Sequence, residues 1–173
     1  MLKSLFKHLQ AILLLPVMMT IVIPVSILSG SKSVSIGWSL AFPLNLLPTF
    51  FSLAFIGAGL TLMIKTNMLF ATIGKGTLAP WTPTQKLVVR GIYRHVRNPM
   101  ISGVFCILLG EALLFGSPNI FTWFMIFVLI NVTYIPLLEE PGLEKRFGQD
   151  YLIYKKNVPR WIPRREPWNA PAS

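Results

Sequence analysis

The sequence lacks the residues from which disulfides and most metal sites are built. Its single cysteine, Cys106, lies inside an apolar run, which excludes an internal disulfide and a cysteine-cluster metal site. We interpret Cys106 as a small buried residue. The two histidines, His8 and His95, do not have the spacing of a metal-binding motif. We therefore expect no metal.

Charge is also scarce, and acidic residues above all. Only 13% of the 173 residues are charged and 53% are hydrophobic, which argues against a soluble globule, and the length suits one domain. Sixteen Lys and Arg residues outnumber six Asp and Glu residues and give a formal net charge of +10. Because these cations lie between apolar runs, they fit loops that face anionic lipid. We expect membrane lipids as partners and no nucleic acid.

What the sequence does have is apolar runs near the roughly 20 residues that a helix needs to cross a bilayer. The first run follows Lys3 and Lys7 as in a signal peptide, but it exceeds the usual core of about 7–15 residues, so we interpret it as a retained span. The apolar stretch 36–70, interrupted by Pro43 and Pro48, predicts one tilted span or two short helices. The expected spans are residues 11–30, 46–63, 100–115 and 120–138.

The last two spans are joined by the four residues Gly-Ser-Pro-Asn, 116–119, which predict a tight turn and an antiparallel hairpin. Ser102, Cys106 and Gly110 recur every four residues and predict a strip that another helix can approach closely. The fold class is therefore all-α, an integral membrane helical bundle of about four to five transmembrane helices with a cytoplasmic C-terminal helical segment. With the N-terminus inside, the inside carries every Lys and Arg except Lys32. We expect both termini and the polar segments in the cytoplasm.

A long polar segment, residues 74–103, separates the first two spans from the hairpin and is rich in Gly, Pro and basic residues. Its cations recur at helical spacing, which predicts a basic interfacial helix, but Gly91 equally allows a turn after Arg90. The cations are Lys86, Arg90, Arg94 and Arg97. Gly74-Lys75-Gly76 could let the backbone pass close to a ligand, although it reads equally well as a plain loop.

Arg97-Asn98-Pro99 is the sharper feature of this segment. Proline keeps Asn98 out of helical geometry and begins the third span. A guanidinium and an amide are thereby expected at a helix N-terminus, where anions are favoured.

A second polar patch begins with Glu139-Glu140 at the end of the fourth span. Near lipid, these carboxylates need a cationic partner, either Arg94 or Arg97 of the central segment or a cationic ligand. Because both patches lie on one membrane face, we interpret them as halves of one site. Within the following residues, Pro141 predicts a new helix and Gly148 interrupts it. Tyr151 and Tyr154 share one side of a short helix at 150–157. Two polar residues lie within the spans, Glu111 deep in the third and Asn131 on the same face as Glu139.

Together these motifs resemble the isoprenylcysteine carboxyl methyltransferase and phospholipid methyltransferase superfamily. The resemblance covers residues 74–163. It is carried by GxG at 74–76, LxxxGxYRxxRNPM at 87–100, the small-residue helix after it, and EEPxLxxxFGxxYxxYxxxVPRWxP at 139–163.

The resemblance implies an integral membrane enzyme that uses S-adenosylmethionine without a Rossmann domain. A lipophilic acceptor would enter from the bilayer, and the C-terminal segment would cover a cofactor bound on the cytoplasmic side. Arg97 and Glu140 are then the catalytic candidates. The implied cofactor-binding residues are Gly74, Gly76, Tyr93, Arg97, Asn98, Pro99, Glu139 and Glu140. We expect one domain, 1–173, made of N-terminal spans (1–70), a connecting segment (71–99), the hairpin (100–138) and the C-terminal segment (139–173).

The acceptor stays open on the sequence. Ile101 stands where the family commonly has Tyr, and the candidates are a prenylated cysteine carboxylate, a phospholipid amine and another small lipophile. An amine needs a base, for which Glu139, Glu140 or Glu111 are candidates. Two other readings remain. A non-catalytic lipid-binding or assembly protein of the same fold would bind no donor. A small transporter would use Glu111 for coupling, but the sequence has no obvious inverted repeat.

Overall fold

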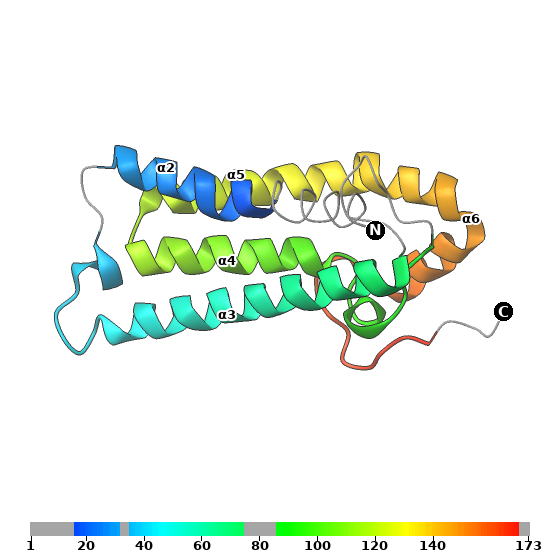
Figure 1. Ribbon diagram of the computed structural model, residues 1–173, viewed down its shortest axis with the longest axis horizontal. Helices are drawn as coiled ribbons and strands as arrows, with labels where there is room; N and C mark the ends of the chain where they lie inside the picture. The colour runs from blue at the N-terminus through cyan, green and yellow to red at the C-terminus, as the bar shows by residue number, and fades with distance from the viewer. Residues whose placement is uncertain (1–15, 32–34, 75–85, 170–173) are drawn as a thin grey trace, which may run out of the picture.

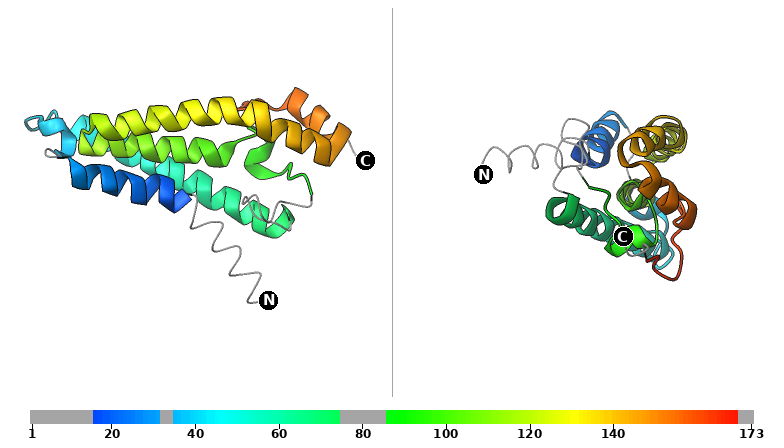
Figure 2. Two further views of the ribbon diagram at one scale, coloured as in Figure 1. Left: turned by 90° about the horizontal axis from the view of Figure 1, so that it is seen from above. Right: turned by 90° about the vertical axis from the view of Figure 1, so that its right-hand side faces the viewer.

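The computed structural model describes residues 16–31, 35–74 and 86–169, and in these ranges all regular structure is helical. The long helices lie side by side with their axes along the longest dimension of the molecule (Figures 1 and 2). The predicted all-α membrane bundle is confirmed. The elements in chain order are η1 (Met18–Val22), α2 (Ile23–Gly30), η2 (Ile36–Ser39), α3 (Leu46–Leu69), η3 (Phe70–Gly74), η4 (Gly91–Arg94), α4 (Pro99–Phe115), α5 (Pro118–Tyr134), η5 (Ile135–Glu139) and α6 (Glu140–Asn157).

Two helices are long and apolar enough to cross a membrane, α3 and the continuous helix Pro118–Asn157. Met18–Gly30 and Pro99–Phe115 are shorter apolar helices. The span expected at 46–63 begins at the predicted residue but runs to Leu69, so the alternative of two short helices is wrong. Pro48 does not break α3 because it occupies the first turn, where no intrahelical N–H bond is needed.

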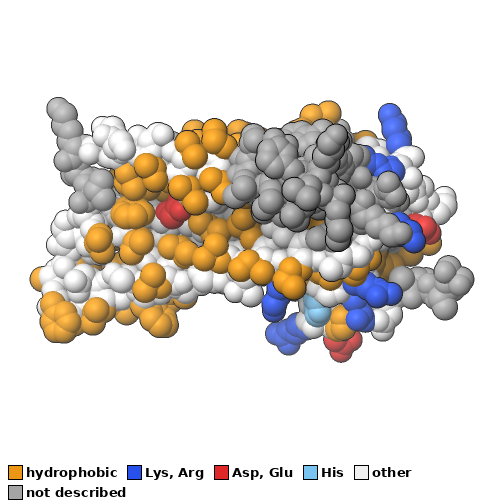
Figure 3. All heavy atoms as spheres, in the orientation of Figure 1, with side chains coloured by type: hydrophobic (Ala, Val, Ile, Leu, Met, Phe, Trp, Pro, Cys, Tyr) orange, Lys and Arg blue, Asp and Glu red, His pale blue; other side chains and the backbone are white. Residues whose placement is uncertain are grey.

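The outer surface of the bundle carries large apolar side chains, which fill much of the face seen in Figure 3. Phe42 is 79% exposed, Phe50 67% and Leu129 60%. A soluble monomer rarely exposes so much contiguous apolar surface, whereas lipid solvates it. The exposed faces therefore fit a bilayer environment.

α3 and α4 pack closely and antiparallel because glycines lie at their contact. A Cβ on Gly59 would lie 2.5 Å from the Gly103 carbonyl oxygen, and one on Gly110 would lie 2.8 Å from that of Ser52. The predicted small-residue strip is thus right at Gly110. At the contact with Gly59, the α4 residue that meets α3 is Gly103, which was not part of the predicted strip. Cys106, which was expected to be buried, is half-buried.

The hairpin of α4 and α5 forms as predicted. Gly116 takes a left-handed conformation with φ of 53°, which glycine adopts without strain. The Ser117 hydroxyl then accepts a hydrogen bond from the Ile120 N–H at 3.3 Å and caps α5, with Pro118 at its first position.

α6 begins at Glu140 with Pro141 in its first turn, as predicted, but it is not a separate helix, because the chain stays helical from α5 through η5. The π-helical turn η5, with Pro136 in its first positions, carries the helix across. The predicted break at Gly148 is confirmed, since φ of 55° and ψ of −131° end the regular helix there. Beyond the break the chain turns back along the bundle (Figure 1).

The basic row at 86–97 is not one helix. Residues 86–90 are irregular, Arg90 is extended, and only Gly91–Arg94 makes a helical turn, η4. Gly91 has φ of 56°, which a continuous helix cannot contain. The alternative of a turn at Arg90 and Gly91 is confirmed.

Candidate active site

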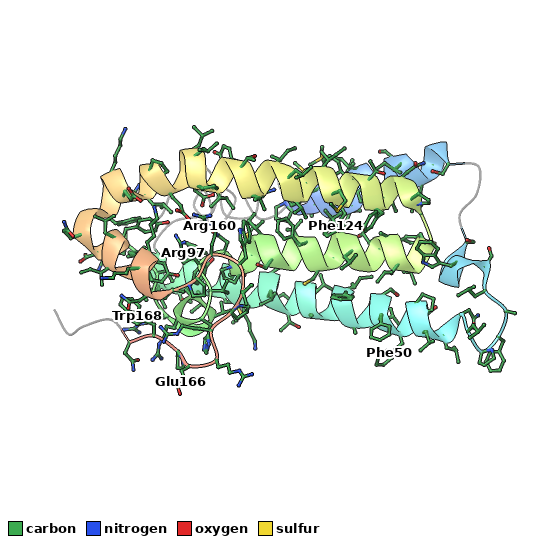
Figure 4. All side chains as sticks on the ribbon, turned by 180° about the vertical axis from the view of Figure 1, so that it is seen from behind. Phe50, Arg97, Phe124, Arg160, Glu166 and Trp168 are labelled. Atoms are coloured by element: carbon green, nitrogen blue, oxygen red, sulfur yellow. The ribbon has the colours of Figure 1, made fainter. Side chains whose placement is uncertain are left out.

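Two segments far apart in sequence meet at the end of the bundle where α6 lies. We call residues 86–98 the site loop and residues 158–169 the tail segment. Their main chains are joined by hydrogen bonds from Arg97 to the Pro159 carbonyl at 2.9 Å, from Arg164 to His95 at 3.0 Å and from Trp168 to Arg94 at 2.9 Å. The two polar patches of the sequence are therefore neighbours in space, as predicted (Figure 4).

Glu140 lies at the centre of the ion pairs at this end, with only 2% of its side chain exposed. Its Oε1 accepts a hydrogen bond from Arg97 Nη1 at 2.7 Å and from Arg160 Nε at 2.6 Å. Its Oε2 accepts from Arg160 Nη2 at 3.0 Å, and Lys155 Nζ lies 3.2 Å away. Both oxygens are thus occupied by cations of the chain itself.

Protonation follows from these contacts. Burial acts to raise the pKa of the Glu140 carboxyl, but the hydrogen bond from Arg160, the charge of Arg97 and the hydrogen bond from Lys155 outweigh it and lower that pKa. The hydrogen bond to Glu140 raises the pKa of Arg160. The hydrogen bond from Lys155 to Glu144, 2.6 Å long, raises the pKa of Lys155. Glu140 is therefore held ionised.

The guanidinium of Arg97 is only partly satisfied. Its side chain is 9% exposed, and Nη1 carries its contacts, to Glu140 and, at 3.5 Å, to the Tyr151 hydroxyl. Its buried Nε has no hydrogen-bond partner among the residues that the structure describes. A buried N–H without a partner is costly, which makes this edge of Arg97 the strongest indication of a ligand.

Two tyrosines lock the site loop to α6. The Tyr154 hydroxyl donates a 2.7 Å hydrogen bond to the Tyr93 carbonyl, and both side chains are buried. The Tyr93 ring packs edge-on against Phe70, with ring centroids 5.3 Å apart. Burial raises the pKa of the Tyr93 phenol, and the charges of Tyr154 and Glu139 add to it. Burial likewise raises that of Tyr154, so both phenols stay protonated at neutral pH.

A model of the family described as phospholipid methyltransferase matches residues 48–150, more than half of the chain. The chain belongs to the phospholipid methyltransferase family. Comparisons with curated proteins and with solved structures gave no match. The chain is thus a membrane methyltransferase of this general kind. The matched region runs from α3 into α6 and contains Arg97 and Glu140, whereas Arg160 and the tail segment lie beyond it.

The remaining residues that were expected to bind the cofactor differ in how deeply they are buried and in where they lie. Pro99 is buried at the first position of α4, and Asn98 precedes it with φ of −120° and ψ of 53°, outside helical geometry as predicted. The Asn98 side chain does not cap α4. Glu139 is exposed, in contrast to Glu140. Gly74 ends η3 at the same end of the bundle, and Gly76 lies outside the described residues.

Two other cations, Arg160 and Lys155, also contact Glu140, and neither was predicted from the sequence. Arg160 makes its two-pronged contact, and Lys155 links it to Glu144. Arg160 belongs to the VPRW motif at 158–161, and this motif was the sequence feature that could have pointed to its role. The pairing expected between Glu140 and Arg97 is present, whereas Arg94 instead donates from Nε to the Trp168 carbonyl at 2.9 Å and from Nη2 to Asn169.

The two polar residues inside the spans do not join this cluster. Glu111 follows Pro99 by twelve residues, about 18 Å along α4. Its buried Oε2 has no hydrogen-bond partner among the described residues. Asn131 is buried and donates to the Phe127 carbonyl at 2.8 Å within α5. In the described part of the chain, no group of three or more His, Cys, Asp or Glu side chains could hold a metal ion.

Proposed function

We propose that this chain is an S-adenosylmethionine-dependent methyltransferase that binds its donor between the site loop and α6, on the cytoplasmic side. It would transfer the methyl group to a lipophilic acceptor that enters from the bilayer. Membership of the phospholipid methyltransferase family supports the reaction class. The observation that carries the choice of site is the buried Nε of Arg97, which has no hydrogen-bond partner among the described residues.

The Nε edge of Arg97 fits a carboxylate or a phosphate. A guanidinium binds such groups by two parallel N–H bonds, and toward the residues that the structure describes Arg97 uses only Nη1. Arg97 lies two residues before the start of α4, whose N-terminus favours negative charge. The surrounding cluster also has one positive charge in excess, since Arg97, Arg160 and Lys155 face Glu140 and Glu144. The donor's amino-acid carboxylate and a phospholipid phosphate both fit this edge.

The donor supplies, when bound, a methyl group on a sulfonium, whose transfer breaks the carbon–sulfur bond and leaves a neutral thioether. The chain's own contribution is alignment and exclusion of water. Glu139, exposed beside Tyr93, is placed to attract the cationic groups of the donor. The tail segment covers the site loop through its main-chain bonds and limits access of water.

The acceptor determines whether a base is needed. A carboxylate acceptor attacks the methyl carbon with its own lone pair, and no proton is released. An amine acceptor releases one proton, which a base must take. Glu140 is poorly suited because its contacts lower its pKa, and Glu111 lies too far along α4. Glu139 is the carboxylate free of those contacts. The family description favours the phospholipid amine.

Binding of S-adenosylhomocysteine to the detergent-purified protein, measured by calorimetry, tests the donor site. Arg97→Lys keeps the charge but removes the two-pronged edge, so we expect binding to weaken by about ten- to a hundredfold, the range for a hydrogen bond to a charged group. Lys86→Ala is the matched control because Lys86 is exposed, and it should bind normally.

Absence of binding by the folded wild-type protein would exclude the donor site and favour a non-catalytic member of the fold. Normal binding by Arg97→Lys together with weaker binding by Lys86→Ala would mean that general positive charge, and not the Arg97 edge, holds the donor. Methyl transfer to phosphatidylethanolamine and to a prenylated cysteine, assayed side by side, then separates the two acceptor classes.

A further inference from the structure

Among the residues that the structure describes, positive charge gathers at one end of the molecule. Every Lys and Arg that the structure describes lies at the end that carries α6, where blue side chains gather in Figure 3, whereas most coloured side chains in the opposite half of that face are apolar. The acids at this end are fewer, and two of them, Glu140 and Glu144, are engaged in ion pairs. The others are Glu139, Asp150 and Glu166. The basic residues are Lys65, Lys86, Arg90, Arg94, Arg97, Lys145, Arg146, Lys155, Lys156, Arg160, Arg164 and Arg165.

The tail segment has two different sides at this end. Toward the bundle, Trp161 packs on Phe105 of α4, with ring centroids 5.4 Å apart and ring planes tilted by 33°. On the other side Ile162 is 80% exposed, the most exposed large apolar residue described. Ile162 stands between Arg160 and Arg164, and Arg165 after them is exposed. An apolar side chain flanked by cations is the pattern of a segment that lies in a membrane interface.

We propose that the tail segment is a docking surface for anionic lipid headgroups of the leaflet at the site end, with Ile162 inserted between the lipids. Arg164 and Arg165 supply the attraction, which Glu166 reduces but does not cancel. Ile162 gains apolar surroundings that no part of the described chain provides. The adjoining exposed cations of the site loop, Lys86 and Arg90, extend the same basic face.

Lipid contact at this surface also acts on the site, a consequence that rests on the proposed function. The main chain of Arg97 itself donates a hydrogen bond to the Pro159 carbonyl of the tail segment, and Arg160 of that segment donates to Glu140. A leaflet that fixes the tail segment therefore fixes the arrangement that presents Arg97 to the donor. We expect donor affinity to be higher in an anionic bilayer than in a neutral one.

A fluorescent probe at Ile162 tests the docking directly. In a Cys106→Ser background, Ile162→Cys is labelled with an environment-sensitive dye and placed in nanodiscs of phosphatidylcholine alone or mixed with phosphatidylglycerol. We expect a blue-shifted, brighter emission in the anionic discs, which high salt reverses because salt screens exposed charges. Arg165→Gln should lower the response by about fivefold, the factor expected for one basic residue near the surface.

A probe at Phe42, exposed at the opposite end of the molecule, is the control and should not respond to lipid charge. Equal emission of the Ile162 probe in neutral and anionic discs would overturn the proposal. So would a blue shift that depends on the number of protein copies per disc, since a second copy would then be the occupant.

Donor binding by unlabelled protein in the same discs separates the two proposals. If the probe responds to lipid charge and S-adenosylhomocysteine never binds, the docking surface stands and the proposed function fails. If S-adenosylhomocysteine binds equally in both discs and the probe does not respond, the function stands and the docking surface is wrong.

Discussion

At the scale of single residues, the site is organised by the pairing of Glu140 with Arg97 and Arg160. Burying one carboxylate is tolerable only because three cations satisfy it, and each of those cations comes from a different part of the chain. This makes Glu140 a positioning residue, which holds the Arg97 guanidinium in place. The neighbouring Glu139 is left exposed and available to a ligand.

Because Glu140 is a positioning residue, removing its charge should mainly lower the stability of the folded protein. Glu140→Gln leaves buried cations without their counter-charge, and we expect it to lower the free energy of unfolding by about 3–5 kcal/mol. Thermal or denaturant unfolding in detergent measures this loss. Glu139→Gln is the matched control and should change stability by less than about 0.5 kcal/mol while weakening donor binding. Normal stability of Glu140→Gln would mean that the ion pairs are dispensable.

Acid should destabilise the protein through the same carboxyl. The contacts lower the Glu140 pKa in the folded state, so its contribution is fully present above the unfolded value of about 4.5 and is lost as pH falls through the folded value. The unfolding temperature should then not depend on this group from about pH 6 to about pH 8, and it should decrease as the pH falls below about 4.5. In Glu140→Gln this part of the acid loss should be missing. An identical acid profile in both proteins would contradict the assignment.

At the scale of elements, the contact between α3 and α4 determines where the start of α4, and with it Arg97, lies. α4 begins at the site, and α3 ends beside the site loop, where Leu69 packs against the position of Gly91. Small residues let the two helices approach closely. Because the hydrophobic effect does not drive helices together inside a bilayer, dispersion contacts between them hold the pair. Their spacing thus holds the start of α4, and with it Arg97, in register.

A methyl group placed at this contact should disrupt it. Gly59→Ala would put a Cβ 2.5 Å from the Gly103 carbonyl oxygen and 2.7 Å from Ile107 Cγ1, so we expect a loss of about 1–3 kcal/mol in unfolding free energy. Gly57→Ala lies on the same helix with no atom within 4 Å and should be neutral or stabilising. Comparing both variants by thermal unfolding isolates the packing term. Equal behaviour of the two would show that the helices do not meet at Gly59.

At the scale of the whole molecule, a bundle of apolar helices carries the described Lys and Arg residues at one end. The membrane-bound family and the two long apolar helices agree with a protein embedded in a bilayer. The concentration of Lys and Arg at the site end supports a cytoplasmic orientation of that end.

Cysteine labelling in intact cells should resolve this orientation. In a Cys106→Ser background, we expect Asn119→Cys, exposed beside the turn between α4 and α5, to react with a membrane-impermeant maleimide from outside. Lys145→Cys, at the site end, should react only after the membrane is opened. Both positions are exposed, so burial does not limit either reaction. The reverse pattern would place the site on the outer face.

The sequence by itself determined the helical membrane class, the hairpin, the break at Gly148 and the family, whereas it left a helix and a turn equally open at Gly91. These features depend on local properties: apolar length, turn chemistry and the order of short motifs. It also brought Arg97 and Glu140 into one site, because charge bias places both polar patches on one membrane face. The residues at 75–85, including Gly76, lie outside the described structure, so the expectation for them stays a prediction.

Tertiary structure alone decided which carboxylate is buried and which cations satisfy it. Glu139 and Glu140 are identical in sequence terms, but the continuous helix through η5 turns Glu140 inward toward Arg160, Lys155 and Arg97 and leaves Glu139 outside. Likewise, only the tertiary structure decided that Gly103 contacts α3, whereas the sequence pattern had pointed to Ser102. The physical reason is the same in both cases. Adjacent residues on a helix point about 100° apart, so a small change in helix phase exchanges the buried residue for its neighbour.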